Sequence, residues 1–199
     1  MVARRLVKWP SASLLRIATP IKKFDVSVVD LACDLRDTMK VHYGAGLASS
    51  QIGEEAAGCV LDESYVPSLP VDPNVESVIF LGNPRIEPLS DRDYQWKEAC
   101  LSVDSIVAKV NRHSKIRLHY RNTCGDSLEA VLEGSEAASV QHEVDHLLGK
   151  LFIHRLEGLT KNMVTRKLRK ISLKRRAVQK AESSKNASKK KRTRKKRRK

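Results

Sequence analysis

Apolar and polar residues follow a helical period in two stretches of the chain. Between residues 26 and 43 the apolar residues recur every three or four positions with aspartates between them, which predicts an amphipathic helix. The same spacing occurs between residues 134 and 149. The expected apolar face there consists of Ala137, Val140, Val144, Leu147 and Leu148. We expect Gly134-Ser135 to supply the N-cap of this second helix and Gly149 to follow its last turn.

Short apolar runs predict the strands. They occupy residues 58–62, 78–81, 106–110, 116–120 and 127–132, with 151–153 as a last short strand. Asn83-Pro84 is expected to form a turn. Runs of this length at close spacing favour antiparallel pairing. Because most strands precede the long helix at 134–149, we expect an α+β fold in which small antiparallel or mixed sheets pack around that central helix.

The two ends of the chain differ from this pattern. Residues 4–24 are interrupted by Pro10 and Pro20, which suits an extended arm lying across a folded body. Residues 160–182 carry a narrow apolar stripe on a basic surface and predict a C-terminal helix. Residues 183–199 are mainly serine, lysine and arginine and are expected to be disordered, because they cannot bury a core. The chain therefore divides into a folded domain (1–159), a basic helix (160–182) and a tail (183–199).

Charge is distributed unevenly along the chain. The net charge is +15, but residues 161–199 contain 20 lysines and arginines and one acidic residue, a net charge of +19. Subtracting +19 from +15 leaves −4 for residues 1–160, so the basicity belongs to the tail. No apolar run is long enough to cross a membrane, no secretory signal is visible, and the four cysteines are not spaced as a disulfide framework. We expect a cytoplasmic protein that does not bind membranes, and we expect it to be a monomer.

The predicted helix 134–149 carries a His-Glu-x-x-His pattern from His142 to His146. Residues four apart lie above one another on a helix, so two neutral imidazoles can reach one metal ion, with the carboxylate beside them as a general base. A catalytic site of this kind needs a third protein ligand, for which Cys100, the other cysteines and a carboxylate are all candidates. The pattern also occurs by chance in chains whose histidines are solvated or bonded within the core.

Two further motifs accompany this pattern. In chain order the three are Gly44-x-Gly46-Leu47-Ala48-x-x-Gln51, Glu98-x-Cys100-Leu101-Ser102 and Gln141-His142-Glu143-x-Asp145-His146. With them the chain resembles the peptide deformylase family, which shows three such motifs in this order. The resemblance extends over residues 5–156, and three spaced motifs are far more specific than any one of them. Residues 1–159 are accordingly expected to form a peptide deformylase catalytic domain.

The resemblance implies a metal-dependent hydrolase that removes the N-formyl group from the formyl-methionine of nascent polypeptides and releases formate. Its metal ligands would be Cys100, His142 and His146, with water in the fourth position. One divalent ion is implied. Fe²⁺ is expected, and Zn²⁺, Ni²⁺ or Co²⁺ can occupy such a site in preparations, because the ligand set alone does not select among them. The metal-bound water would be the nucleophile and Glu143 its general base.

Oxyanion and substrate contacts follow from the same resemblance. The side-chain amide of Gln51 and the backbone N–H of Leu101 would stabilise the oxyanion, which makes both of them catalytic groups. Substrate binding would fall to Gly46, Ala45, Leu101 and Ala99. Glu98 and Arg112 are expected to form a supporting ion pair near the site, unless they are two unrelated surface charges.

Four positions depart from the usual pattern of the family. Ser49 stands where alanine is frequent, Ala99 where glycine is usual, Asp104 where proline is common, and Ala45 where a larger aliphatic residue is frequent. None of them removes a ligand, the general base or an oxyanion donor. They are expected to change the shape of the substrate groove and the turnover rate rather than the reaction.

The basic tail suggests a polyanionic partner. Phosphate backbones attract such segments through counterion release, so residues 160–199 are expected to contact ribosomal RNA and to dock the chain on the ribosome. Two other functions stay open. A different His-Glu-x-x-His hydrolase, such as a metallopeptidase, would cleave internal amides. A catalytically idle deformylase-like protein would serve as a nucleic-acid-binding module, although the intact Glu143, Gln51 and ligand set argue against it.

Overall fold

The computed structural model describes residues 3–92 and 94–196 of the 199-residue chain. Three α-helices are α1 (Val26–Val41), α2 (Gly134–Leu147) and α3 (Gly158–Lys196). The strands are β1 (Gly46–Ala48), β2 (Gly58–Asp62), β3 (Val78–Pro88), β4 (Tyr94–Cys100), β5 (Val103–Arg112), β6 (Lys115–Arg121) and β7 (Ser127–Glu133). Short 3-10 turns lie at Ala12–Leu15 (η1), Ser49–Ile52 (η2), Glu63–Tyr65 (η3) and Phe152–Arg155 (η4). The fold is α+β, as the sequence predicts.

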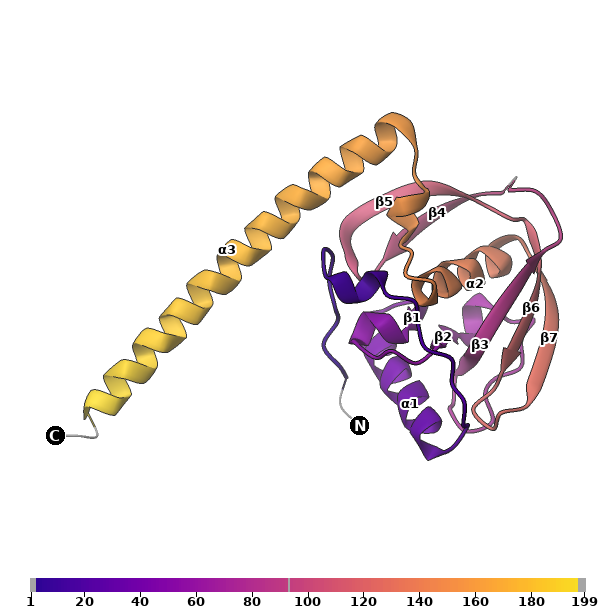
Figure 1. Cartoon of the computed structure of the whole chain (residues 1–199), viewed down its shortest axis with the longest axis horizontal. Coiled ribbons are helices and arrows are strands. Elements are labelled where there is room, and N and C mark those ends of the chain that lie inside the picture. Colours follow the sequence, from indigo (N-terminus) through magenta and orange to yellow (C-terminus); the bar gives the residue numbers. More distant parts are fainter. Residues whose placement is uncertain (1–2, 93, 197–199) are drawn as a thin grey trace.

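Two antiparallel sheets surround α2 (Figure 1). Five strands pair in the order β1-β2-β3-β6-β7, and β4 and β5 form a separate hairpin. One face of the larger sheet packs against α2, and the face of β1 and β2 that points the other way packs against α1. Successive side chains of β2 therefore enter two different core clusters, Cys59 and Leu61 on the α2 side and Val60 on the α1 side. This explains why β2 is a continuous apolar run.

The central helix is buried on both of its faces. Four residues of its predicted apolar face (Ala137, Val140, Val144 and Leu147) belong to the core cluster, but Leu148 is 47% exposed and does not. The opposite face, with His146 and Asp145, is also buried, because the β4–β5 hairpin covers it. The β4–β5 hairpin therefore forms a second layer of protein over the histidine side of α2.

The two ends of α2 are formed differently. The helix begins at Gly134, and Glu133 at the N-cap position makes no side-chain cap, so the prediction of a Ser135 cap is wrong. At its C-terminus Gly149 has a φ of +68°, as the predicted C′ glycine requires. Its N–H donates to the carbonyl of His146, and the N–H of Lys150 donates to that of Asp145. These two bonds close a Schellman motif directly behind the second histidine.

Two short segments differ from the prediction. Asn83-Pro84 does not end a strand but forms a bulge within β3, where the register with β6 shifts between Gly82 and Arg85. The side-chain amide of Asn83 exchanges two hydrogen bonds of 2.8 Å with the backbone of Ile21, which holds the N-terminal arm against this bulge. Residues 151–153 form no strand. Leu151 is the N-cap residue of η4, and Phe152 and Ile153 form its first two positions. All three side chains are buried, and the N–H of His154 donates to the carbonyl of Leu151.

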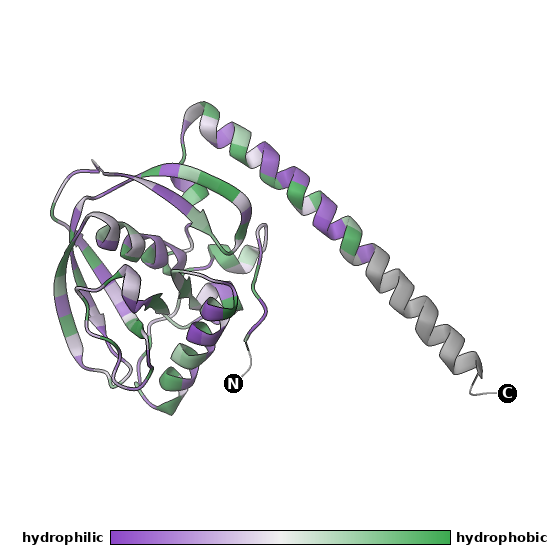
Figure 2. Ribbon diagram, turned by 180° about the vertical axis from the view of Figure 1, so that it is seen from behind, coloured by the Kyte–Doolittle hydropathy of each residue, from purple (hydrophilic) through white to green (hydrophobic). Residues whose placement is uncertain are grey.

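The C-terminal helix leaves the body after its first turns (Figure 1). Leu168 and Ser172 are buried against the body, and Lys167 donates to the carbonyl of Ser105 in β5. Hydrophobic and hydrophilic positions alternate along the coloured part of α3 (Figure 2). The helix extends to Lys196, into residues 183–199 where the sequence predicts disorder, and no glycine or proline follows Gly158. Residues 197–199 lie outside the described part of the chain, which contains no helix apolar enough to span a bilayer.

The glycine at the end of α2 provides a test of the fold. A Cβ at Gly149 would lie 2.5 Å from the carbonyl oxygen of Leu15, in addition to the strain of a positive φ. We expect Gly149→Ala to lower the free energy of unfolding by more than about 2 kcal/mol in urea denaturation. Gly134→Ala is the matched control, since its φ is +57° but nothing lies within 4 Å of the added Cβ. The free energy of unfolding of that control is expected to fall by about 1 kcal/mol. Equal decreases in both variants would contradict this account.

Candidate active site

The structure brings the three predicted ligands together. His142 and His146 lie one turn apart on α2, and Cys100 ends β4 opposite them. One donor atom from each of the three residues lies within 4.8 Å of the others. Among these contacts, the Sγ of Cys100 is 3.2 Å from the Nε2 of His146. A thiolate sulfur and two imidazole nitrogens are donors that suit a divalent transition metal.

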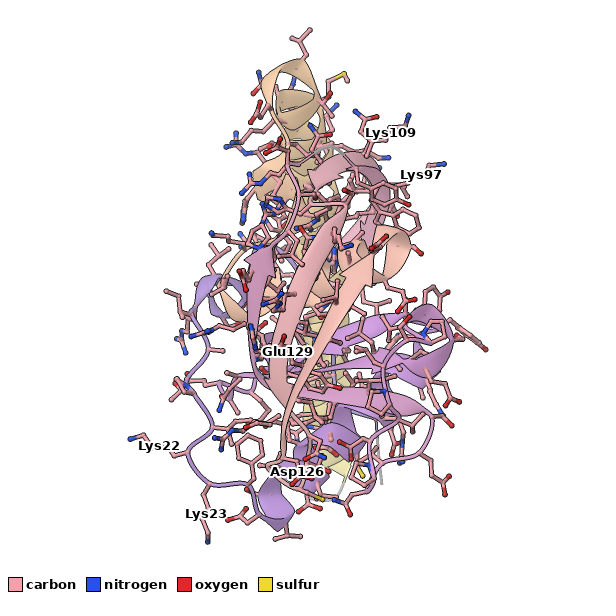
Figure 3. All side chains as sticks on the ribbon, turned by 90° about the vertical axis from the view of Figure 1, so that its right-hand side faces the viewer. Lys22, Lys23, Lys97, Lys109, Asp126 and Glu129 are labelled. Atoms are coloured by element: carbon pink, nitrogen blue, oxygen red, sulfur yellow. The ribbon has the colours of Figure 1, made fainter. Side chains whose placement is uncertain are left out.

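The orientation of His142 is fixed from behind by Glu98. Successive side chains of β4 point to opposite faces of the hairpin. Lys97 points away from the body, as does its partner Lys109 on β5 (Figure 3). Glu98 therefore points inward, and its Oε2 lies 2.6 Å from the Nδ1 of His142. A carboxylate on one imidazole nitrogen leaves the other nitrogen free to face a metal ion. This arrangement fits the donor set of a metal site.

A buried ion network lies behind the ligands. The guanidinium of Arg112 on β5 binds both carboxylate oxygens of Glu98, at 2.6 and 2.9 Å, and also binds Asp145 on α2. Asp145 in turn accepts two hydrogen bonds from Arg155. Burial opposes the charge of Glu98, but hydrogen bonds from His142 and Arg112 outweigh it and lower the pKa of Glu98. The predicted pair of Glu98 and Arg112 is confirmed as a buried ion pair.

Glu143 is buried next to the predicted ligands, and one of its carboxylate oxygens has no hydrogen-bond partner in the described part of the chain. Burial raises the pKa of its carboxyl group to about 7. In the described part of the chain its Oε2 makes no hydrogen bond to protein. A Cβ placed on Gly46 would lie 2.6 Å from the Oε1 of Glu143, so only glycine permits β1 to approach this carboxylate so closely. The carboxylate can therefore accept and release a proton within the cavity.

The first two motifs meet beside Cys100. The side-chain oxygen of Gln51 accepts from the N–H of Ala48 at 2.8 Å, which directs its amide nitrogen toward the β4–β5 turn. That nitrogen lies 3.2 Å from the Oγ of Ser102 and 3.5 Å from the Sγ of Cys100. Ser102 also donates its backbone N–H to the same sulfur at 3.4 Å. The amide of Gln51 is thus fixed at the edge of the donor cluster.

A cavity of about 430 Å³ opens in front of these groups. Its lining includes all of the predicted substrate and catalytic residues, namely Ala45, Gly46, Gln51, Ala99, Leu101 and Glu143. Of the three predicted ligands, Cys100 and His142 border the cavity and His146 lies behind them. Sequence reasoning missed the aromatic side chains in this lining, Tyr43, Tyr65 and Trp96. Trp96 could have been found, since it lies on the same face of β4 as Glu98 and Cys100.

The family model described as polypeptide deformylase matches residues 3–162. The chain belongs to the peptide deformylase family. A peptide deformylase of Acinetobacter baumannii is 34% identical over 166 residues, which are 83% of this chain and 90% of that relative. Removal of N-terminal formyl groups by a metalloenzyme is therefore its activity.

Solved deformylases have the same fold. The crystal structure of the deformylase from Legionella pneumophila superposes with a TM-score of 0.75 at 32% identity, covering 87% of this chain and 98% of that one. The deformylase of Ehrlichia chaffeensis, solved in complex with actinonin, has a TM-score of 0.74 at 27% identity and covers 85% and 98%. The family match ends at residue 162, so most of α3 lies beyond it.

Metal retention tests the contact between Glu98 and His142. In Glu98→Gln the imidazole loses its carboxylate partner, so we expect the affinity for a divalent metal to fall about 10–100-fold in a chelator competition. The matched control is Glu129→Gln, because Glu129 on β7 contacts His119 on β6 at 3.3 Å in the five-stranded sheet, outside the donor cluster. That variant is expected to hold the metal as tightly as the unmodified deformylase. Equal affinities in all three proteins would contradict the role of Glu98.

Proposed function

We propose that this deformylase removes the formyl group from formyl-methionyl nascent peptides, and that it acts as a monomer in the cytoplasm. The observation that carries the proposal is the Glu143 carboxylate, which is buried, unpartnered at Oε2 and adjacent to three metal-binding side chains. A buried carboxyl group with a pKa of about 7 holds and releases a proton equally well near neutral pH. Hydrolysis of a formamide includes both a proton removal and a proton delivery, and one group with such a pKa can serve both.

The metal ligands in this proposal are Cys100, His142 and His146. When bound, a divalent ion lowers the pKa of a water molecule and polarises the formyl oxygen. Fe²⁺ is the ion we propose on the basis of the family resemblance, and Zn²⁺, Ni²⁺ and Co²⁺ are also compatible with one sulfur and two nitrogens. Glu98 keeps His142 in the orientation that binding requires.

Glu143 acts as general base and then as general acid. It takes the proton of the attacking water and passes it to the nitrogen of methionine as the C–N bond breaks, so that formate and a free amine leave the site. Burial favours both roles, because it raises the pKa of the carboxyl group to about 7. In addition, no permanent cation among the described residues holds the carboxylate in its charged form. Gly46 brings the backbone of β1 against this carboxylate, and the substrate backbone can therefore lie along β1 within reach of the proton.

Two donors stabilise the charge that develops on the formyl oxygen. They are the amide nitrogen of Gln51, whose position is set by the N–H of Ala48, and the backbone N–H of Leu101 in the β4–β5 turn. Donors that are fixed before the reaction need no reorganisation in the transition state. Ala45, Gly46, Leu101 and Ala99 contact the substrate along the cavity, whose apolar and aromatic lining suits a methionine side chain.

The role of Glu143 is tested by formate release from a short formyl-methionyl peptide. Glu143→Gln keeps the size of the side chain but cannot take a proton, so we expect kcat to fall about 10²–10⁴-fold while the metal content stays constant. The matched control is Glu136→Gln on the same helix, where Glu136 contacts Ser68 at the surface. Full activity in Glu143→Gln would refute its assignment as the general base.

We also propose that α3 docks the enzyme on ribosomal RNA. Its exposed side chains between residues 161 and 176 include Lys161, Arg166, Lys170, Lys174 and Arg176, and 11 further lysines and arginines follow between residues 181 and 199. Such a density of positive charge favours a phosphate backbone over an uncharged partner. An apolar face suited to a bilayer is lacking along the described part of α3, so we prefer RNA to an anionic membrane.

Docking is tested by sedimentation with purified ribosomes at several salt concentrations. We expect the affinity to fall steeply with salt, and replacement of the 11 lysines and arginines of residues 181–199 by glutamine to weaken it at least about tenfold. This variant keeps the chain length, and its formate release should equal that of the unmodified enzyme. Affinity that is independent of salt, or unchanged in the variant, would count against docking through the tail.

A further inference from the structure

The N-terminal arm contacts both segments that supply the proposed oxyanion donors. The N–H of Val7 donates to the carbonyl of Gln51 at 2.8 Å, and the N–H of Trp9 donates to the carbonyl of Ser102 at 2.9 Å. The residue between them, Lys8, donates its Nζ to the carbonyl of Leu101 at 2.6 Å. Three consecutive arm residues therefore join η2 to the β4–β5 turn, although 50 residues separate Gln51 from Leu101 in the sequence.

Lys8 is held in place by a second partner. Its Nζ lies 2.7 Å from a carboxylate oxygen of Asp104, at the start of β5. The two side chains are only 31% and 29% exposed, so their contact is partly shielded from water and salt. Asp104 stands where the family commonly has proline, and a proline could not supply this charge. The ion pair therefore distinguishes this chain from the usual family pattern.

The C-terminal helix also contacts Asp104 and the N-terminal arm. Arg175 on α3 lies 3.4 Å from the other carboxylate oxygen of Asp104 and donates to the carbonyl of Trp9 at 3.0 Å. Leu168 and Ser172, about two turns and one turn before Arg175, are buried, which fixes this part of α3 on the body. Asp104 thus accepts from both the arm and α3, and it keeps Lys8 directed at the turn.

We propose that Lys8 is a positioning residue for the deformylase reaction. The inference rests on the proposed oxyanion role of Leu101. The Lys8 ammonium fixes the Leu101–Ser102 peptide plane, whose Ser102 N–H donates to the sulfur of Cys100. Fixing this plane restrains the backbone torsions of Leu101, which set the direction of the Leu101 N–H in the preceding peptide plane. Asp104 and Arg175 hold Lys8 in that position. An oxyanion donor is effective only when it is directed at the developing charge beforehand. Loss of Lys8 therefore reduces the stabilisation of the transition state and leaves substrate binding nearly unchanged.

The test compares steady-state kinetics of formate release by the full-length, metal-loaded enzyme and its variants. Lys8→Met keeps the length of the side chain and removes its charge. We expect kcat to fall about tenfold or more with KM within about twofold, and Lys8→Arg to recover most of the loss. Lys115→Met is the matched control, because Lys115 on β6 forms an ion pair of 2.6 Å with Glu133 on β7 in the five-stranded sheet. It should retain the kcat of the unmodified enzyme.

Two further readouts separate positioning from a general loss of stability. In Lys8→Met, hydrogen exchange of the amides between residues 100 and 104 should accelerate, while the midpoint of thermal unfolding should match that of Lys115→Met. Asp104→Asn, which keeps the shape but not the charge, should show a smaller fall in kcat in the same direction. An unchanged kcat in Lys8→Met, or a loss that Lys8→Arg does not recover, overturns the inference. No formate from the unmodified enzyme would instead overturn the proposed function.

Discussion

A single buried guanidinium connects the parts of the structure on which the site depends. Arg112 comes from β5, Glu98 from β4 and Asp145 from α2, so its ion pairs join the β4–β5 hairpin to the central helix. Removing one partner from a buried pair of this kind leaves an uncompensated charge and costs about 3–5 kcal/mol. The same Glu98 orients His142. Burial of the network therefore serves the fold and the ligand geometry at once.

Next to this network lies a carboxylate whose Oε2 accepts no hydrogen bond within the described part of the chain. On the ligand side every carboxylate is held by an arginine or a histidine, which lowers the pKa values of Glu98 and Asp145 despite their burial. Glu143, one residue from His142, has no such permanent cation, and burial raises its pKa to about 7. Asp145 and Glu143 lie two positions apart on α2, but their side chains point in different directions around the helix. Asp145 is therefore paired with arginines, whereas Glu143 faces the cavity.

The sequence predicted what local patterns encode. The His142 and His146 pair follows from helical spacing, and the strands follow from short apolar runs. Asn83-Pro84, predicted as a turn, is a bulge that only the pairing with β6 reveals. Residues 151–153 were predicted as a strand from their apolar character, but Leu151 caps a 3-10 turn and Phe152 and Ile153 form part of it. All three are buried, and an apolar pattern of three residues cannot distinguish such a turn from a strand. The resemblance to the family, rather than any periodicity, selected Cys100 among four cysteines.

Long-range contacts lay outside the reach of the sequence. Lys8 meets Leu101 across 93 positions, and neither residue type marks the other as a partner. Asp104 was noticed as a departure from the family pattern, but its meaning depends on Lys8 and Arg175, which come from the two ends of the chain. The aromatic residues of the cavity were likewise missed, because Tyr43 and Tyr65 come from segments that are joined only by the fold.

The central claim is that the Cys100, His142 and His146 site hydrolyses a terminal formamide. Mass spectrometry of a formyl-methionyl tripeptide, incubated with the iron-loaded enzyme in ¹⁸O-labelled water, tests it most directly. The account predicts a product that has lost only the formyl group, with its peptide bonds intact and the label in the released formate. Cleavage of an internal peptide bond, or recovery of the intact formyl peptide, would contradict it.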